Sequence, residues 1–340
     1  MTTTPPPATP TSTQTQPPEP PPPGGLPPTR GRLRGLGSVL GIVVSIVALA
    51  GVVWWALRQD PPRLPHGAAQ IGALVGAIAL YGVNTLVRSE RWHRLLLDDG
   101  GRPARADSYA LTTIGYAVNN VLPARAGDAV RVVLMAPRAA ASRRTVLGTI
   151  VAERLLDVAV ILVLFLVVGY AVLGEVGADS VEWIALVTAA VIAAVVLAIV
   201  LVRRNERIHA FVAPMLSSTA RLLSGHGALL VAITFLVWII EALTWILVGA
   251  SVGFGMSFLE GLYLVALASV FALIPSGPGY AGTQDAAAVI GIKAIGGTGA
   301  TAVSYLVMLR FVLLVPITAI GFLLLVTRYG GLARARAGRA

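Results

Sequence analysis

The sequence predicts an all-α polytopic membrane protein with about six full spans and two broken-helix hairpins of opposite orientation. Three observations predict this fold class. Of the 340 residues, 56% are hydrophobic and only 12% are charged, against roughly 25% charged in a typical soluble domain. Apolar runs recur along the chain at about 20 residues each, enough to cross a hydrocarbon core about 30 Å thick. Two further apolar regions are interrupted by proline and glycine.

The N-terminal segment differs from the rest of the chain. Residues 1–35 hold 12 of the 22 prolines and lack hydrophobic periodicity, so we expect a disordered cytoplasmic tail, which could also carry a polyproline site for a protein partner. The first apolar run, residues 37–57, is too long for the h-region of a signal peptide. A transmembrane domain is predicted over 36–328 and a basic cytoplasmic tail over 329–340.

The predicted spans follow from the apolar runs. Full spans are expected at 37–57, 68–88, 146–172, 182–202, 228–250 and 300–326. The two broken regions run over 106–136, interrupted at 122–128, and over 257–294, interrupted at 274–280. Because proline removes a helical donor and glycine relaxes the backbone, neither region should be one continuous helix. Such a break survives at membrane depth only where protein buries it or it lines a cavity.

The positive charges predict the topology. Nineteen of the 26 lysines and arginines lie in the N-terminal tail, Arg88–Arg105, Arg138–Arg144, Arg203–Arg221 and Arg328–Arg339. The positive-inside rule places these stretches and both termini in the cytoplasm, with the chain in the inner cell membrane. This placement explains the net charge of +10 without nucleic acid as a partner.

With that topology, each broken region must enter and leave on one side, the first from the cytoplasm and the second from the exterior. The two interruptions share the pattern Leu/Ile-Pro-x-x-x-Gly at 122–127 and 274–279. Broken segments at corresponding places in oppositely oriented halves indicate an inverted-repeat transporter with re-entrant helices.

Polar residues gather at the first interruption. They are Asn119, Asn120, Arg125, Asp128 and Arg131. A charge at membrane depth usually faces a cavity or a partner, and the planar fork of arginine suits phosphate. A helix that begins near the break would add N–H groups that favour an anion. Alternatively, Asp128 and Arg131, three residues apart, simply pair with each other.

A second cluster lies on the next span. Glu153 and Asp157 are four residues apart and share one helix face with Arg154 nearby. Asp157 lies roughly 16 Å along the span that begins at Val146, near mid-bilayer. Two roles remain open for these acids: ion pairing with the arginines of the first cluster, or proton coupling.

The second interruption offers further candidate binding residues. They are Ser276, Gly277, Gly279, Gln284 and Asp285. The glycines would let a ligand approach the backbone closely, or would only form a tight turn. Glu241 and Arg310 both lie near the middle of their spans, and we expect them to form a buried structural ion pair.

Several chemistries are excluded or disfavoured. The chain has no cysteine, which excludes disulfides, thiolate nucleophiles and cysteine-ligated metals. The four histidines are scattered, so no metal site is expected. No nucleophile triad stands out, so the sequence favours a transporter over an enzyme. No cofactor is expected.

The motifs at these clusters resemble those of a known family. Residues 119–131 resemble the signature of the lysylphosphatidylglycerol synthase transmembrane-domain family, which are flippase-like integral membrane proteins. Residues 153–157 and 274–282 resemble further motifs of the family, in the same order, over about 36–328. The resemblance implies a membrane module that moves lipid, with Arg125, Asp128, Arg131, Glu153, Arg154 and Asp157 lining the lipid path. Bifunctional members add a soluble aminoacyl-transferase domain, which we do not expect here.

The leading hypothesis is therefore a lipid transporter or flippase. It would move an anionic or aminoacylated phospholipid, or a polyprenyl-phosphate-linked lipid, between leaflets. Arg125 and Arg131 would hold the phosphate, while Glu153 and Asp157 would balance charge or couple protons. One alternative is a membrane transferase acting on lipid-linked sugars, although the external loops are short. The other is a non-catalytic component of a cell-envelope complex. The sequence leaves open which lipid is moved, in which direction and with what energy source. It also leaves open whether the protein forms a homo-oligomer.

Overall fold

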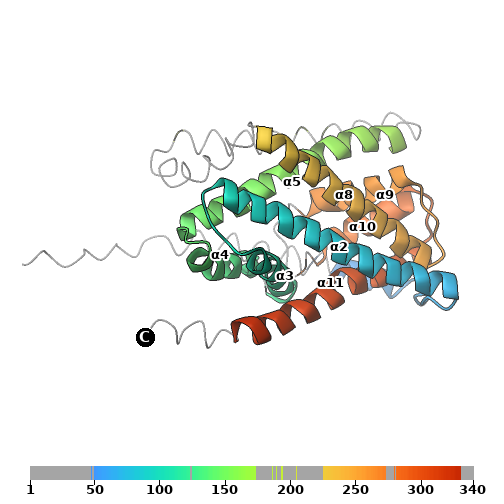
Figure 1. Ribbon diagram of the computed structural model, residues 1–340. Coiled ribbons are helices and arrows are strands. Elements are labelled where there is room, and N and C mark those ends of the chain that lie inside the picture. Colours follow the sequence, from blue (N-terminus) through green and yellow to red (C-terminus); the bar gives the residue numbers. More distant parts are fainter. Residues whose placement is uncertain are drawn as a thin grey trace, which may run out of the picture.

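The regular secondary structure of the described residues is entirely helical. The structure, a computed structural model, describes residues 50–122, 125–173, 225–272 and 281–330, with positions 47, 186, 189, 193, 204 and 279. After a first helical stretch at 50–56, the helices are α2 (Ala68–Asp98), α3 (Arg105–Val121), α4 (Ala126–Arg138), α5 (Arg143–Leu173), α8 (Gly225–Ser251), α9 (Phe258–Phe271), α10 (Thr283–Ala294) and α11 (Gly299–Tyr329). Figure 1 shows them as one bundle of long helices with shorter ones packed between them.

Four predicted spans coincide with the long helices α2, α5, α8 and α11. Among the described residues, α2, α11 and the segment Gly227–Ser251 of α8 are each long and apolar enough to cross a membrane. The α2 helix extends beyond the predicted end at residue 88, to Asp98. The predicted span 182–202 lies outside the described residues except at isolated positions, as do both tails and the first part of the span at 37–57.

The helices break at the two interruptions that proline and glycine predicted. The first break separates α3 from α4, and the second separates α9 from α10. At the first break, Arg125 adopts a left-handed conformation (φ 53°) directly before α4. The side-chain oxygen of Asn119 accepts a hydrogen bond from Gly127 N at 2.7 Å, which satisfies one of the N–H groups left open at a helix start.

The α3 and α4 helices run antiparallel and in close contact. Near the break Asn119 bonds to Gly127, and further along Gly115 lies against the side chain of Arg131. At the far end Arg102 N donates to the carbonyl oxygen of Ala139 at 2.9 Å. The pair therefore begins and ends at the same end of the molecule.

The connections gather at two opposite ends of the bundle. At one end, which we call the basic end, Asp107 pairs with Arg328 at 3.1 Å and lies 3.9 Å from Arg138. At the other, which we call the opposite end, Arg63 N donates to Ser304 Oγ at 2.9 Å. The connections predicted to be cytoplasmic before α3, after α4 and after α11 thus lie together.

The α9–α10 pair opens toward the opposite end. The turn before α9 lies there, with Gly253 beside the side chain of Gln70 near the start of α2. The ammonium group of Lys293, in the last turn of α10, lies 5.8 Å from the ring centre of Trp55. The two short-helix pairs therefore enter the bundle from different ends.

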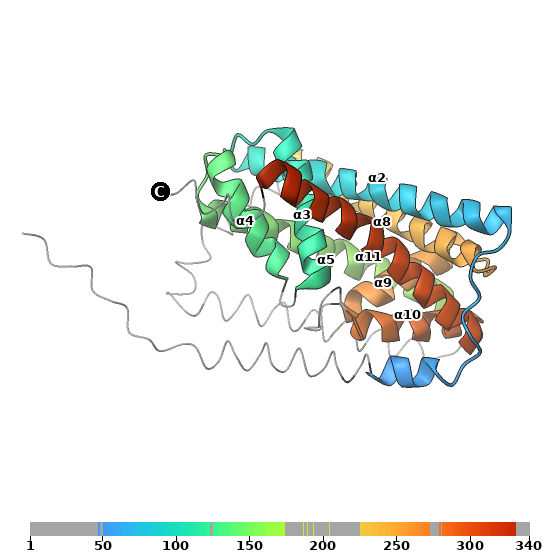
Figure 2. The same ribbon diagram turned by 90° about the horizontal axis from the view of Figure 1, so that it is seen from below.

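The helices fall into two matching halves, α2–α5 and α8–α11. Corresponding helices have 31 and 27, 17 and 14, 13 and 12, and 31 and 31 residues. Their partners also correspond: α3 packs on α11 as α9 packs on α5, and α2 packs on α5 as α8 packs on α11. The first helices of the halves, α2 and α8, pack side by side (Figures 1 and 2). They run antiparallel, because Asn84 meets Glu241 while Arg91 meets Thr234.

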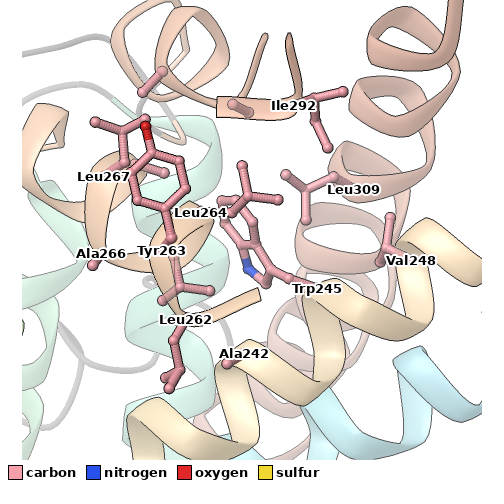
Figure 3. Packing of buried hydrophobic residues seen from close by; sticks show 14 of the residues in the cluster. Ala242, Trp245, Val248, Leu262, Tyr263, Leu264, Ala266, Leu267, Ile292 and Leu309 are labelled. Carbon is pink, nitrogen blue, oxygen red and sulfur yellow. The ribbon is translucent and has the colours of Figure 1, made fainter. Parts of the chain in front are cut away.

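Each half has a core built around a buried tryptophan. Figure 3 shows Trp245 of α8 beside Leu264 and Leu309 in the second half, and Trp92 of α2 is buried in the first. Trp92 Nε1 donates to Thr149 Oγ1 at 3.0 Å, and the Tyr305 hydroxyl donates to the carbonyl oxygen of Trp245 at 3.2 Å. Thr149 and Tyr305 are each the seventh residue of their long helix. The buried tryptophan and its hydrogen-bonding partner therefore occupy corresponding positions in the two halves.

Candidate functional site

A cluster of buried charge joins three helices of the first half at the break between α3 and α4. We call it the charge network. Its members are Arg91 from α2, Asp128 and Arg131 from α4, and Glu153, Arg154 and Asp157 from α5. Because Glu153 and Asp157 are four residues apart, one face of α5 presents both acids to the two neighbouring helices.

The centre of the charge network is Arg91. It binds Asp157 through two parallel hydrogen bonds, Nη1 to Oδ1 at 2.7 Å and Nη2 to Oδ2 at 3.1 Å. Nη2 also lies 3.4 Å from Glu153 Oε1, and Nη1 donates to Thr234 Oγ1 on α8 at 2.9 Å. Arg91 is fully buried. This two-pronged geometry is the strong form of an arginine–carboxylate bond.

Arg131 is held on two sides. Its Nη2 donates to Glu153 Oε2 at 2.8 Å, and its guanidinium carbon lies 4.0 Å from the ring centre of Trp92. The side chain is 0% exposed. Asp128, three residues earlier, lies farther away, at 3.7 Å. The sequence left open whether Arg131 pairs with Asp128 or with an acid of the second cluster. Both pairings occur, and the one with Glu153 is the closer.

The outer edge of the charge network is more open. Arg154 Nη2 lies 3.5 Å from Asp128 Oδ1, and Nη1 lies 3.8 Å from Asp157 Oδ2. The side chains of Arg154 and Asp128 are 24% and 17% exposed. Arg125, at the start of α4, is exposed. Among the described charged residues at the break, these three are the more accessible.

The two asparagines of the first cluster fix the break in place. Asn119 binds Gly127 N and lies 3.5 Å from Asp128 Oδ1 through Nδ2. Asn120 Nδ2 donates to Thr318 Oγ1 on α11 at 3.0 Å. Their bonds connect the end of α3 to both halves of the molecule.

The formal charge of the network is zero, since three arginines face three carboxylates. Removing a single charge from water into a membrane protein is costly, and such groups pair with one another. Truncating one partner would leave an uncompensated buried charge. The network therefore ties α2, α4 and α5 together as a unit.

The second interruption carries a separate ion pair. Arg310 on α11 binds Asp285 on α10. Its Nη1 also donates to the carbonyl oxygen of Gly279 at 2.5 Å, and Gly282 N donates to Asp285 Oδ2 at 2.8 Å. Gln284 is partly buried on the first turn of α10. The other two candidates of this group, Ser276 and Gly277, lie outside the described residues.

The predicted pair of Glu241 and Arg310 is wrong, because each residue has a different partner. Glu241 lies 3.4 Å from Arg88 and accepts a hydrogen bond from Asn84 Nδ2 at 2.5 Å. The reason is the packing of the helices: this face of α8 is turned toward α2, whereas Arg310 on α11 is turned toward α10.

Comparison with known proteins identifies the family. Residues 38–321 match the family described as lysylphosphatidylglycerol synthase TM region. The chain belongs to this family. It is also 25% identical over 326 residues to a UPF0104 membrane protein of Methanothermobacter thermautotrophicus, covering 84% of this chain and 93% of that protein. No solved structure matches the chain.

This member of the lysylphosphatidylglycerol synthase TM-region family is a multi-pass membrane protein with several apolar helices. Sequence reasoning missed Arg91 of the charge network and Arg88, the partner of Glu241. Both fall in the basic stretch that the positive-inside rule placed in a cytoplasmic loop, but both lie inside α2 and contact buried acids. The available signal was Leu95 and Leu96, apolar residues after the arginines that continue the helix for a further two turns.

Proposed function

We propose that this protein moves a lipid with an anionic headgroup, a phospholipid or a polyprenyl-phosphate-linked lipid, between the leaflets of the membrane. The observation that carries the proposal is the charge network at the α3–α4 break, whose partly exposed edge offers an arginine inside an apolar helix bundle. A charge at that depth is expected to serve a substrate path. Membership of a family named for a lipid synthase supports a lipid as the substrate.

In this proposal the headgroup binds at the edge of the network. Arg125 and Arg154 bind the phosphate, and the N–H groups at the start of α4 add to the attraction. The sequence analysis also predicted that Arg131 binds the phosphate. Its complete burial and its bond to Glu153 favour a positioning role, in which Arg131 holds α4 against α5.

The two halves support an alternating mechanism. We propose that they form an inverted repeat and that the α3–α4 and α9–α10 pairs are re-entrant hairpins. Two observations support this: the equivalent helices α2 and α8 run antiparallel, and the two hairpins enter from different ends. The basic end would face the cytoplasm, with both termini, in the inner membrane.

The test is leaflet exchange of a fluorescent phosphatidylglycerol in proteoliposomes. Replacing Arg154 with alanine removes one charge-assisted hydrogen bond to the headgroup, and we expect exchange to slow by about tenfold or more. The matched control is Arg143→Ala, an exposed arginine at the start of the same helix, which should exchange at the wild-type rate. Equal rates for both variants would refute the role of Arg154.

Lipids that co-purify with the protein provide an independent test. Mass spectrometry of the wild type should find one anionic or carrier lipid enriched over bulk lipid. The Arg125→Ala/Arg131→Ala variant should lose that enrichment, because it removes a headgroup ligand and the residue that positions α4. Only bulk lipid in both samples would contradict the proposal.

A further inference from the structure

The ion pair of the second half occupies the same position as one in the first half. Asp128 and Asp285 are each the third residue of their short helix, α4 or α10. Arg154 and Arg310 are each the twelfth residue of their long helix, α5 or α11. Each acid lies against the arginine of its own half. The arrangement at the edge of the charge network therefore occurs twice in the molecule.

The two pairs differ in closeness. Asp128 and Arg154 are 3.5 Å apart, whereas Asp285 and Arg310 are in direct hydrogen-bonding contact through Nε and Nη2. Arg310 also binds the carbonyl oxygen of Gly279. In this conformation Asp285 and Arg310 form a closed pair, in direct contact, whereas Asp128 and Arg154 form a more open pair with a longer separation.

A pocket of about 460 Å³ lies at the second pair. Val52, Val53 and Ala56 of the first helical stretch line it together with Val303 and Val307 of α11. Among the described residues that line it, Asp285 and Arg310 are the only charged ones. A soluble anion would gain little from such aliphatic walls, whereas a hydrocarbon chain attached to a charged group would match both parts.

A buried hydroxyl lies near the pocket, although it is not part of the pocket lining. Thr283, the first residue of α10, is 5% exposed, and its Oγ1 has no hydrogen-bond partner within the described part of the chain. It is two residues from Asp285. A buried polar atom without a partner is uncommon in folded proteins.

We propose that Asp285, Arg310 and this pocket form a second lipid site, the counterpart of the site at Asp128 and Arg154. The phosphate of the headgroup binds Arg310, and one hydrocarbon chain lies in the pocket. The proposal rests on the proposed function, since it takes the transported lipid as the ligand. It gives that lipid one binding site in each half.

The closed pair can open for a phosphate. Asp285 keeps a bond from Gly282 N when Arg310 turns away, and it lies in the first turn of α10, where the helix dipole favours a negative charge. Arg310 then exchanges one oxyanion for another. The counterpart Asp128 also lies in the first turn of its helix, so the same exchange is open to the first pair.

Photolabelling of the full-length protein tests the site. The probe is phosphatidylglycerol with a diazirine at the end of one acyl chain, present as a minor lipid in proteoliposomes. Label should map to residues 50–56 and to α11 around Val307. Arg310→Gln should reduce it by about tenfold, as expected for loss of a charge-assisted hydrogen bond. Val307→Trp fills the pocket without removing either charge of the ion pair and should abolish the label.

The matched control is Val315→Trp, which adds the same side chain to another exposed position of α11 outside the pocket lining. It should label like the wild type. Labelling that is equal in the wild type and in Val307→Trp would identify bulk lipid and overturn the proposal.

Exchange measured in the same vesicles separates the two proposals. Arg154→Ala should slow exchange and retain the label in the pocket, which would support two distinct sites. Loss of pocket label in Arg154→Ala, with its fold intact by thermal unfolding, would overturn the second site as an independent one. Pocket labelling in a wild type that shows no exchange would refute the proposed function and leave the site standing.

Discussion

The pair of Arg88 and Glu241 lies where the two halves meet. Arg88 is four residues before Trp92 on α2, and Glu241 is four residues before Trp245 on α8. Since the two tryptophans correspond between the halves, the arginine and the glutamate occupy equivalent positions. In the proposed inverted repeat, a residue that contacts its own counterpart lies on the axis that relates the halves. This pair, 3.4 Å apart and largely buried, therefore stabilises the contact between the halves.

Glu241→Gln should destabilise the protein. The substitution leaves Arg88 buried without a carboxylate, which typically costs about 3–5 kcal/mol. We expect a lower midpoint of thermal unfolding in detergent. The exchanged variant Arg88→Glu/Glu241→Arg should recover much of the loss, because the two positions are equivalent and the charges still face each other. No recovery in the exchanged variant would show that Asn84 and Trp245, which also bind Glu241, matter more than the ion pair.

Among the helices, the contact between α3 and α4 depends on two glycines. A side chain at Gly127 would collide with the backbone carbonyl oxygen of Gly115, and one at Gly115 would collide with the side chain of Arg131. The absence of a Cβ at both positions lets the helices approach closely. That approach brings Arg131 to Glu153, so the charge network depends on the packing of this pair.

Gly127→Ala should separate α3 from α4. Overpacking of this kind typically costs about 1–3 kcal/mol, and a rigid backbone atom cannot move aside as a side chain can. Thermal unfolding should show the loss, and lipid exchange should fall with it because the edge of the charge network shifts. The control is Gly72→Ala, in α2, where nothing lies within 4 Å of the added carbon. There alanine should be neutral or stabilise the helix by up to about 1 kcal/mol. Equal behaviour of the two variants would contradict the packing argument.

For the whole molecule, the sequence predicted the features that depend on local sequence patterns, namely the long helices and their breaks. Long apolar runs predicted α2, α5, α8 and α11, and proline with glycine predicted both breaks. The first polar cluster does meet the second, at Arg131 and Glu153. The partners of Glu241 and Arg310 were not predictable, because they depend on which face of a helix meets which neighbour. Arg91 was missed for a related reason: a basic residue near a span end is usually in a loop.

The arrangement of the halves leads to a topology that single cysteines can test, since the chain has no native cysteine. Arg102 and Arg143 flank the α3–α4 pair, and Gly255 and Ala294 flank the α9–α10 pair. All four positions are exposed. If both pairs are re-entrant, cysteines at Arg102 and Arg143 should react with an impermeant maleimide from one side of the membrane, and those at Gly255 and Ala294 from the other.

The pattern of labelling distinguishes the alternatives because each hairpin is tested by its own two positions. If α9 and α10 together crossed the bilayer, Gly255→Cys and Ala294→Cys would react from opposite sides, and the same holds for Arg102→Cys and Arg143→Cys around the first pair. Reaction of all four after permeabilisation is the control for accessibility. Reaction of all four from one side would refute the inverted repeat, since antiparallel halves must place their hairpin openings on different faces.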